Sequence, residues 1–167
     1  MVGEVTLSSG QTAEYYVDAR RAVLRPEGFL AAGELIADAA VGRGAEAVGG
    51  PVMAAIPLAC AAIAVPGGSG LVGFFVRKEG KAHGLQRMVE GPVEPGTKVL
   101  VVEDTVTTGG STIAAIEQIR DQGLEIVGGV CVVDRLAGGA EAIAAAMDAP
   151  FEALVTIDEI YPDRPDR

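Results

Sequence analysis

The sequence predicts an α/β fold in which helices cover a parallel sheet. Short apolar runs alternate along the chain with Ala-rich helical patterns, and this order is typical of parallel strands joined by crossover helices. Hydrophobic residues make up 49% of the chain, whereas aromatic residues make up 4% and Trp is absent. This composition suits buried strands packed against helices of small residues. With 167 residues, the chain has the size of one compact domain, and we expect a single domain over residues 1–167.

The N-terminal part predicts a strand pair followed by a helix. Residues Val5 to Ala19 alternate loosely and contain the turn-prone Ser8-Ser9-Gly10, as a hairpin does. Pro26 is suited to the first turn of the helix, which should end near Gly42 and Gly44. One face of this helix gathers small and apolar side chains, namely Leu30, Gly33, Ile36, Ala37 and Ala40.

The next segment predicts a strand, a helix and a second strand. We expect the first strand over Ala45 to Val48, before Gly49-Gly50-Pro51 breaks the chain. An Ala-rich helix fits Met53 to Ala64, and Pro66-Gly67-Gly68 should end it. The second strand is expected from Leu71 to Val76.

The C-terminal half repeats this alternation. Lys98 to Val102 is an apolar run too short for a helix, and Thr105 to Ser111 forms a polar turn before a helical pattern. Further elements are expected as a helix from Thr112 to Gln122 capped by Gly123, strands over Ile126 to Val133 and Ala153 to Ile157, and a helix over Glu141 to Met147.

Charge and composition exclude several function classes. The formal net charge of −10 opposes non-specific attraction to nucleic acid or anionic lipid, so a site that binds anions must be local. Cys60 and Cys131 lack CxxC spacing and lie in apolar stretches, and we expect both to be reduced core residues. No apolar run reaches the roughly 18 residues of a membrane span, and no signal pattern opens the chain, so we expect the cytoplasm.

The strongest functional signal lies in residues 99–112, where a buried strand leads into two acids and a hydroxyl-rich turn. Backbone N–H groups in the turn and at the following helix N-terminus can hold a phosphate. Gly109 and Gly110 allow the backbone to approach it closely. Glu103 and Asp104 would repel a phosphate unless they face sugar hydroxyls or a metal ion. Hydroxyl donors are expected from Thr107, Thr108, Ser111 and Thr112. The stretch therefore predicts a ribose phosphate site, since helix capping alone needs neither acid.

A second cluster is the basic segment 77–87, which contains four of the 13 Lys and Arg residues and the single His. The segment follows an apolar strand and contains glycines, which favours a mobile loop that binds anions over an ordinary solvated loop. One histidine without nearby Cys or His is a weak metal site, so we expect no direct metal ligand at His83.

Arg135 follows Asp134 at the end of a predicted buried strand. An arginine at this position must meet an anion or point to solvent, and its guanidinium fits a carboxylate through two hydrogen bonds. The alternative is a surface ion pair with Asp134.

Residues 99–112 resemble the phosphoribosyl pyrophosphate (PRPP) signature of the type I phosphoribosyltransferases. Within that family the chain resembles the orotate phosphoribosyltransferases over nearly its whole length, through Tyr15-Tyr16-Val17-Asp18, Pro26-Glu27-Gly28, Gly49-Gly50-Pro51, Ile56-Pro57-Leu58-Ala59, Arg77-Lys78-Glu79 and Val132-Val133-Asp134-Arg135. The resemblance implies a twisted parallel sheet with a small hood over its carboxyl end, whose strands lie within about residues 1–20. It also implies the Mg²⁺-dependent reaction of PRPP with orotate, which gives orotidine 5′-monophosphate and pyrophosphate in pyrimidine biosynthesis.

The resemblance also implies residue roles. Lys81 and His83 would act in catalysis together with Glu103 and Asp104, which hold the ribose hydroxyls. Mg²⁺ would be held mainly by the substrate, near these two acids. The pyrophosphate would contact Arg77, Lys78, Lys81 and His83 of the neighbouring subunit of a homodimer, whose loop 77–87 completes the site. The phosphate would lie against Thr105, Thr107, Thr108, Gly109, Gly110 and Ser111.

The base is expected at three residues: Arg135 would bind the orotate carboxylate, Thr107 would hydrogen-bond the base, and Tyr16 would lie against its ring. The sequence departs from the family pattern, because known bacterial members have Lys at the positions of Ser8 and Ala54, and many relatives have Thr at that of Val106. Two alternatives are a purine phosphoribosyltransferase and a PRPP-sensing regulator that binds nucleic acid. The arginine disfavours the first, and the acidic charge disfavours the second.

Overall fold

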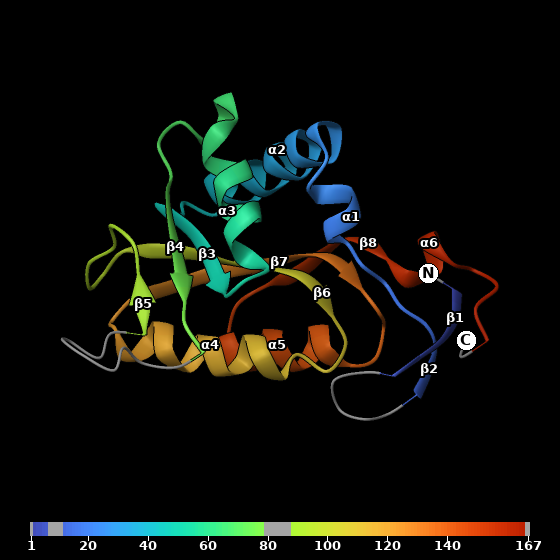
Figure 1. Ribbon diagram of the computed structural model, residues 1–167. Coiled ribbons are helices and arrows are strands. Elements are labelled where there is room, and N and C mark those ends of the chain that lie inside the picture. The colour runs from blue at the N-terminus through green and yellow to red at the C-terminus, as the bar shows by residue number, and fades with distance from the viewer. Residues whose placement is uncertain (1, 7–11, 79–87, 166–167) are drawn as a thin grey trace.

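The computed structural model describes residues 2–6, 12–78 and 88–165. Within these residues the elements follow one another in the order expected for an α/β chain (Figure 1). They are β1 (Val2–Thr6), β2 (Thr12–Tyr15), α1 (Arg20–Val23), α2 (Pro26–Gly42), β3 (Ala47–Pro51), α3 (Ala55–Ala64), the 3₁₀ turn η1 (Pro66–Gly68), β4 (Val72–Val76), β5 (Val89–Glu90), β6 (Lys98–Val106), α4 (Gly110–Asp121), β7 (Glu125–Asp134), α5 (Gly139–Met147), β8 (Phe151–Thr156) and α6 (Ile157–Ile160).

The main sheet has six strands in the order β5-β4-β3-β6-β7-β8. Every neighbouring pair is parallel except β4 and β5, so the predicted parallel sheet is confirmed. The antiparallel strand β5 was not predicted, because a two-residue strand carries no periodicity that a sequence pattern could reveal.

Helices cover both faces of this sheet, with α2 and α3 on one side and α4 and α5 on the other (Figure 1). Alternate residues of β6 point to opposite faces, as pleating requires. Leu100 and Val102 pack in the core beneath α2 and α3, whereas Val99 and Val101 pack in the core beneath α4 and α5. The central strand is thus buried from both sides, which explains its continuous apolar run.

The predicted N-terminal strand pair is confirmed, although it begins earlier than expected. β1 and β2 form a separate antiparallel sheet, in which Val2 pairs with Tyr15 and Thr6 with Thr12. Figure 1 places this sheet at the end of the molecule where α6 lies. The following residues lead to α1, a one-turn helix that the sequence pattern did not reveal.

Two expectations about packing were wrong. Leu30 lies at the margin of the buried face of α2 and is 52% exposed, because the face that meets the core is formed by Ala32, Gly33, Ile36, Ala37 and Ala40. Cys60 is exposed on α3, whereas Cys131 is buried in β7 as expected. Burial raises the pKa of the Cys131 thiol to about 12, which keeps it protonated at neutral pH.

The predicted chain break at Gly49-Gly50-Pro51 was also wrong, because these residues are the last three of β3. The small size of the two glycines serves packing in the sheet. A Cβ on Gly50 would collide with the carbonyl oxygen of Val102 in the neighbouring strand β6. The sequence signal for a turn was therefore a signal for close approach between strands.

None of the helices in the described part of the chain is long and apolar enough to span a membrane.

Candidate active site

The candidate site lies at the carboxyl edge of the sheet, where β3 and β6 are neighbours. These two strands are distant in sequence, and the strand order runs in opposite directions on either side of them, toward β4 and toward β7. Such a switch in strand order leaves a crevice outside the carboxyl ends of the strands, and ligands of open α/β sheets bind there. The end of β6 carries Glu103 and Asp104 into this crevice.

Glu103 is nearly fully buried, with 5% of its surface exposed. Its Oε1 accepts a hydrogen bond of 3.1 Å from the backbone N–H of Asp104, and its Oε2 accepts one of 3.0 Å from the hydroxyl of Thr112. Burial, followed by the negative charge of Asp104, raises the pKa of Glu103 to about 7. Near neutral pH the two acids therefore tend to retain a proton when no cation is bound.

Asp104 is half-buried, and its Oδ1 accepts a hydrogen bond of 2.6 Å from the backbone N–H of Thr105. Burial raises its pKa, while this hydrogen bond and the positive charge of Arg20 act in the opposite direction. Thr105 still belongs to β6, and its buried Oγ1 has no hydrogen-bond partner among the described residues. The polar turn begins after Val106 and so is shorter than the sequence suggested.

The turn delivers the N-terminus of α4 to the same edge. Gly109 is the N-cap residue, with a φ of 78°, and no side chain caps the first turn of the helix. A Cβ at this position would lie 2.8 Å from the Cγ1 of Ile143, so both conformation and space require glycine. Because no side chain caps this helix end, its first N–H groups are available to an anion. Thr107 is half-buried, and Thr108, Gly110 and Ser111 are exposed around the helix end.

Thr112 does not belong to this group of phosphate donors, contrary to the sequence-based expectation. Its side chain is 1% exposed, and its hydroxyl donates to Glu103. It faces inward because α4 packs its buried face, which includes Ala115 and Ile116, onto the sheet. Thr112 therefore acts on the acid rather than on a ligand.

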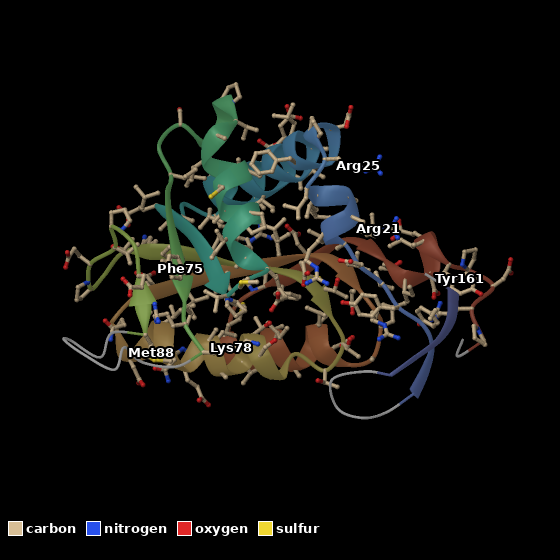
Figure 2. All side chains as sticks on the ribbon, in the orientation of Figure 1. Arg21, Arg25, Phe75, Lys78, Met88 and Tyr161 are labelled. Carbon is tan, nitrogen blue, oxygen red and sulfur yellow. The ribbon has the colours of Figure 1, made fainter. Side chains whose placement is uncertain are left out.

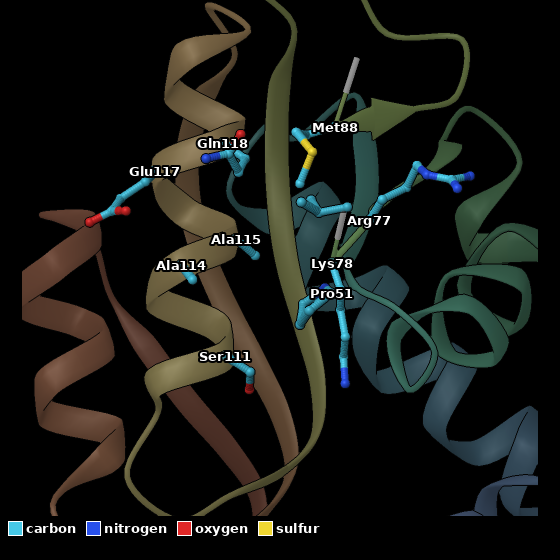
Figure 3. A pocket seen from close by; sticks show the side chains of 10 residues that line it. Pro51, Arg77, Lys78, Met88, Ser111, Ala114, Ala115, Glu117 and Gln118 are labelled. Carbon is cyan, nitrogen blue, oxygen red and sulfur yellow. The ribbon is translucent and has the colours of Figure 1, made fainter. Parts of the chain in front are cut away.

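A cavity of about 320 Å³ adjoins the helix end (Figure 3). Ser111 of α4 lines one wall, and Pro51 and Lys78, which end or follow strands of the sheet, line the opposite wall. Figure 3 shows the side chains of Lys78 and Ser111 at the same end of the cavity. An ammonium group is thus placed close to the uncapped helix end, and both favour an anion.

The predicted basic loop is only partly described. Arg77 follows β4, where its backbone N–H donates to the carbonyl of Met88 at 2.8 Å and its guanidinium lies 3.8 Å from the carboxylate of Glu90. Lys81 and His83, together with most of the loop expected over 77–87, lie outside the described residues, as does Ser8. Ala54, at the other position where relatives have Lys, is the N-cap residue of α3.

Arg135 directly follows β7, the strand that neighbours β6 in the sheet. Its guanidinium carbon is 5.0 Å from the ring centre of Tyr15, and its buried Nε has no hydrogen-bond partner among the described residues. The alternative of a surface pair with Asp134 was wrong. Asp134 is 6% exposed and its Oδ1 accepts from the backbone N–H of Leu136. The arginine is therefore held by an aromatic ring and not by the neighbouring acid.

Tyr16 lies on the segment that leads from β2 to α1. Its hydroxyl accepts a hydrogen bond of 3.0 Å from Arg20, which also donates to Asp18 at 2.8 Å. Tyr15 and Tyr16 line a second cavity, of about 420 Å³, with residues from β7, β8 and α6. The residues expected for the sugar, the phosphate and the base thus occupy adjoining parts of one edge of the molecule.

Comparison with known proteins agrees with this geometry. Residues 41–150 match the family model of the phosphoribosyl transferase domain. The chain is 48% identical over 160 residues to the orotate phosphoribosyltransferase of Streptomyces avermitilis, covering 95% of this chain and 88% of that protein. The chain belongs to the orotate phosphoribosyltransferase family.

Two solved structures of the Mycobacterium tuberculosis H37Rv orotate phosphoribosyltransferase extend the family match to three dimensions. The complex with Fe(III) dicitrate gives a TM-score of 0.83 at 42% identity, covering 95% of this chain and 90% of that one. The complex with PRPP gives a TM-score of 0.80 at 38% identity, with the same coverage. The family fold is thus shared over almost all of the chain.

Three interactions at the site were missed by sequence reasoning. The bond from Thr112 to Glu103 joins residues nine positions apart, and no periodicity signals such a contact. Arg20 follows Asp18 by two residues, a spacing that could have suggested their ion pair. Tyr161 packs against Tyr15 from the opposite end of the chain, and no local pattern could have indicated it.

Proposed function

We propose that this chain transfers the 5-phosphoribosyl group of PRPP to orotate, giving orotidine 5′-monophosphate and pyrophosphate for pyrimidine biosynthesis. The observation that carries the proposal is the placement of two adjacent acids, the buried Glu103 and the half-buried Asp104, one turn before an uncapped helix N-terminus. A ribose phosphate presents hydroxyls, which suit the acids, and a phosphate, which suits the N–H groups at the start of α4. A single turn of the chain separates the acids from these N–H groups.

In this proposal the sugar lies over the end of β6. Asp104 and Glu103 accept hydrogen bonds from the ribose hydroxyls, and their negative charge stabilises the positive charge that develops at the anomeric carbon. The 5′-phosphate lies in the turn from Thr107 to Ser111, where the first N–H groups of α4 complement its charge. The binding energy gained on the phosphate thereby fixes the sugar for reaction.

The residues present fit a magnesium ion. Carboxylate oxygens are ligands that Mg²⁺ prefers, and a cation beside Glu103 and Asp104 would offset the repulsion between the two adjacent carboxylates. Asp104, as the more exposed acid, would meet the ion on the substrate side, with Glu103 behind it. When bound, Mg²⁺ would neutralise charge on the pyrophosphate. Among the described residues no group of three His, Cys, Asp or Glu side chains could hold a metal by itself, so the substrate would supply the other ligands.

The base would lie between the turn and the N-terminal segment. Arg135 would bind the orotate carboxylate, Thr107 would hydrogen-bond the ring, and Tyr16 would lie against its face. The buried Nε of Arg135, without a partner among the described residues, supports this role, because a buried donor without an acceptor is costly unless a ligand completes it. A purine offers no carboxylate, so this arginine favours orotate.

The leaving pyrophosphate would meet the basic loop. Lys78 lines the cavity beside the N-terminus of α4, which supports a role in pyrophosphate binding for the basic loop that begins at Arg77. We propose that Arg77, Lys78, Lys81 and His83 act across a homodimer, so that the loop of one subunit completes the site of its partner.

The test is the loss of orotate absorbance upon mixing with PRPP and Mg²⁺. Adenine, hypoxanthine and uracil, which lack the carboxylate, serve as competing bases in parallel reactions. We expect orotate to be the only one of these bases that is consumed. Consumption of a purine at a higher rate than orotate would contradict the proposed specificity, and no reaction with any base would contradict the proposed transfer.

A further inference from the structure

The C-terminal segment contributes an aromatic residue to the base-binding end of the site. We infer that Tyr161 is a positioning residue, which holds Tyr15 and through it the guanidinium of Arg135 in the orientation that binds the orotate carboxylate. The inference rests on the proposed function. Tyr161 lies beyond residues 41–150, where the family model ends. Figure 2 labels it at the end of the molecule that carries α6 and the N-terminal strands.

The three side chains form a continuous stack. The ring of Tyr161 meets the ring of Tyr15 edge to face, with centroids 5.5 Å apart and an angle of 88° between the ring planes. On Tyr15, the guanidinium carbon of Arg135 lies 5.0 Å from the ring centre. Tyr15 is 4% exposed, so both contacts are largely shielded from water. Edge-to-face packing and cation–π attraction are both directional, and together they define the position of the charge.

The arginine depends on this support because other contacts are few. Its backbone N–H donates to Val106 at 2.9 Å, which fixes the main chain but leaves the side chain unrestrained. The adjacent Asp134 is engaged with Leu136. Within the described part of the chain, no hydrogen bond or ion pair holds the guanidinium, so the Tyr15 ring is the contact that orients it.

The position of Tyr161 is in turn fixed by the start of α6. Thr156, the last residue of β8, forms a capping box with Glu159: the backbone N–H and the hydroxyl of Thr156 both donate to the Glu159 carboxylate, at 2.7 and 2.8 Å. The backbone N–H of Tyr161 then donates to the carbonyl of Ile157 at 2.8 Å. A capping box fixes the direction in which a helix leaves a strand. The end of β8 thereby sets where the Tyr161 ring lies.

A cavity of about 420 Å³ lies beside the stack, and Tyr15 and Tyr161 both line it. Tyr15 is buried and Tyr161 is half-buried, so Tyr161 covers Tyr15 on this side. Without Tyr161, the edge-to-face contact on Tyr15 would be lost, so the Tyr15 ring and the guanidinium that lies over it should be less well ordered. A looser arginine binds a carboxylate less well because its ordering costs free energy on binding.

The first experiment measures steady-state kinetics of Tyr161→Ala and Tyr161→Phe. We expect the alanine variant to raise the KM for orotate about fivefold, with the KM for PRPP within twofold of wild type and kcat little changed. The phenylalanine variant keeps the ring and should restore the wild-type KM. Ile160→Ala is the matched control, because Ile160 is adjacent, lines the same cavity and carries no aromatic ring.

A second measurement is independent of activity. The Nε–H resonance of Arg135, assigned by its loss in Arg135→Lys, should carry a ring-current shift from Tyr15 in the free protein. This shift should decrease in Tyr161→Ala and persist in Tyr161→Phe and Ile160→Ala.

The outcomes of these experiments distinguish the positioning role of Tyr161 from the proposed function of the chain. An unchanged orotate KM and an unchanged Arg135 resonance in Tyr161→Ala would overturn the inference while leaving the proposed function intact. An equal rise in both KM values would also overturn it, since that result indicates general damage. If wild type fails to consume orotate, the proposed function falls and this inference with it. Should Tyr161→Ala not fold, Tyr161→Leu keeps apolar volume without a ring and replaces it in the same comparison.

Discussion

The hydroxyl of Thr112 donates a hydrogen bond of 3.0 Å to the Oε2 of Glu103, and so ties the first turn of α4 to the end of β6. The helix end proposed for the phosphate and the acid proposed for the sugar are thereby one connected unit. This bond lowers the pKa of Glu103 against the larger effect of burial. It therefore favours the charged acid that the proposed reaction requires.

Replacing Thr112 with Val should raise the pKa of Glu103 further, because the carboxylate loses a donor. We expect kcat at pH 7 to fall roughly threefold and the acid limb of the kcat profile to move to higher pH. Thr112→Ser keeps the hydroxyl and serves as the control. The measurement is the pH dependence of orotate consumption, and an identical profile for Thr112→Val would contradict the role of this bond.

The pKa of Glu103, raised to about 7, makes a prediction about the stability of the ligand-free protein. Between the ordinary glutamate pKa of 4.5 and about 7, the folded protein keeps a proton that the unfolded chain has lost. The contribution of this group to the free energy of unfolding is thus fully present below pH 4.5 and is lost as the pH rises through 7.

Glu103→Gln removes this titration. Urea unfolding at pH 5 and pH 8 should show a smaller decrease in stability for the variant than for wild type. Equal decreases in the two proteins would mean that Glu103 is charged at neutral pH in the free protein.

Asp104→Asn should lower kcat about 100-fold, because a charged acceptor near the developing positive charge is lost. The half-buried position of Asp104 leaves the fold intact, so thermal unfolding should change little. Asp121→Asn, at the exposed end of α4, is the matched control and should retain wild-type turnover. Wild-type turnover in Asp104→Asn would remove this acid from the proposed mechanism.

Arg135→Ala should raise the KM for orotate by about tenfold or more and leave the KM for PRPP nearly unchanged, because orotate alone offers the carboxylate. Arg120→Ala is the control, since Arg120 lies on α4 and donates to the carbonyl of Ala146. Initial rates over a grid of both substrate concentrations separate the two KM values. A comparable rise in both would assign Arg135 a different role.

The proposed shared site predicts complementation between two inactive proteins. Lys81→Ala and Asp104→Asn should each be nearly inactive alone. After joint unfolding and refolding, about half of the dimers are mixed, and each has one intact site of two, so activity should return to roughly a quarter of wild type. Mass spectrometry verifies the mixed dimers. If they form without any recovery, the loop serves its own chain.

Much of this fold could be predicted because its signals are local. The apolar run before Glu103, the hydroxyl-rich turn and the Ala-rich helices each reflect the burial of one element. The sequence patterns that were interpreted wrongly were those in which a residue is explained by a contact with a distant part of the chain. Gly50 was interpreted as a turn residue, although it is small because β6 passes against it. Leu30 was expected to be buried but is exposed, because helical periodicity does not show at which residue α2 begins to pack against the core.

The same contrast between local and distant causes holds for the site. The proximity of residues 103–111 could be predicted because they are contiguous in the sequence, whereas the hydrogen-bond partners of their side chains could not. Thr112 was expected to face the ligand, and only the packing of α4 turns it toward Glu103. The stack of Tyr161 on Tyr15 joins the two ends of the chain, so its discovery required the tertiary structure.

The arrangement of the tyrosines has a practical consequence. The chain contains 3 Tyr and no Trp, and Tyr15, Tyr16 and Tyr161 all line one cavity. The near-ultraviolet circular dichroism of the protein should therefore arise mainly from this corner, while the far-ultraviolet signal arises from the helices and the sheet. Unlabelled protein thus offers two optical signals, by which the ordering of the base-binding end can be followed separately from the folding of the sheet.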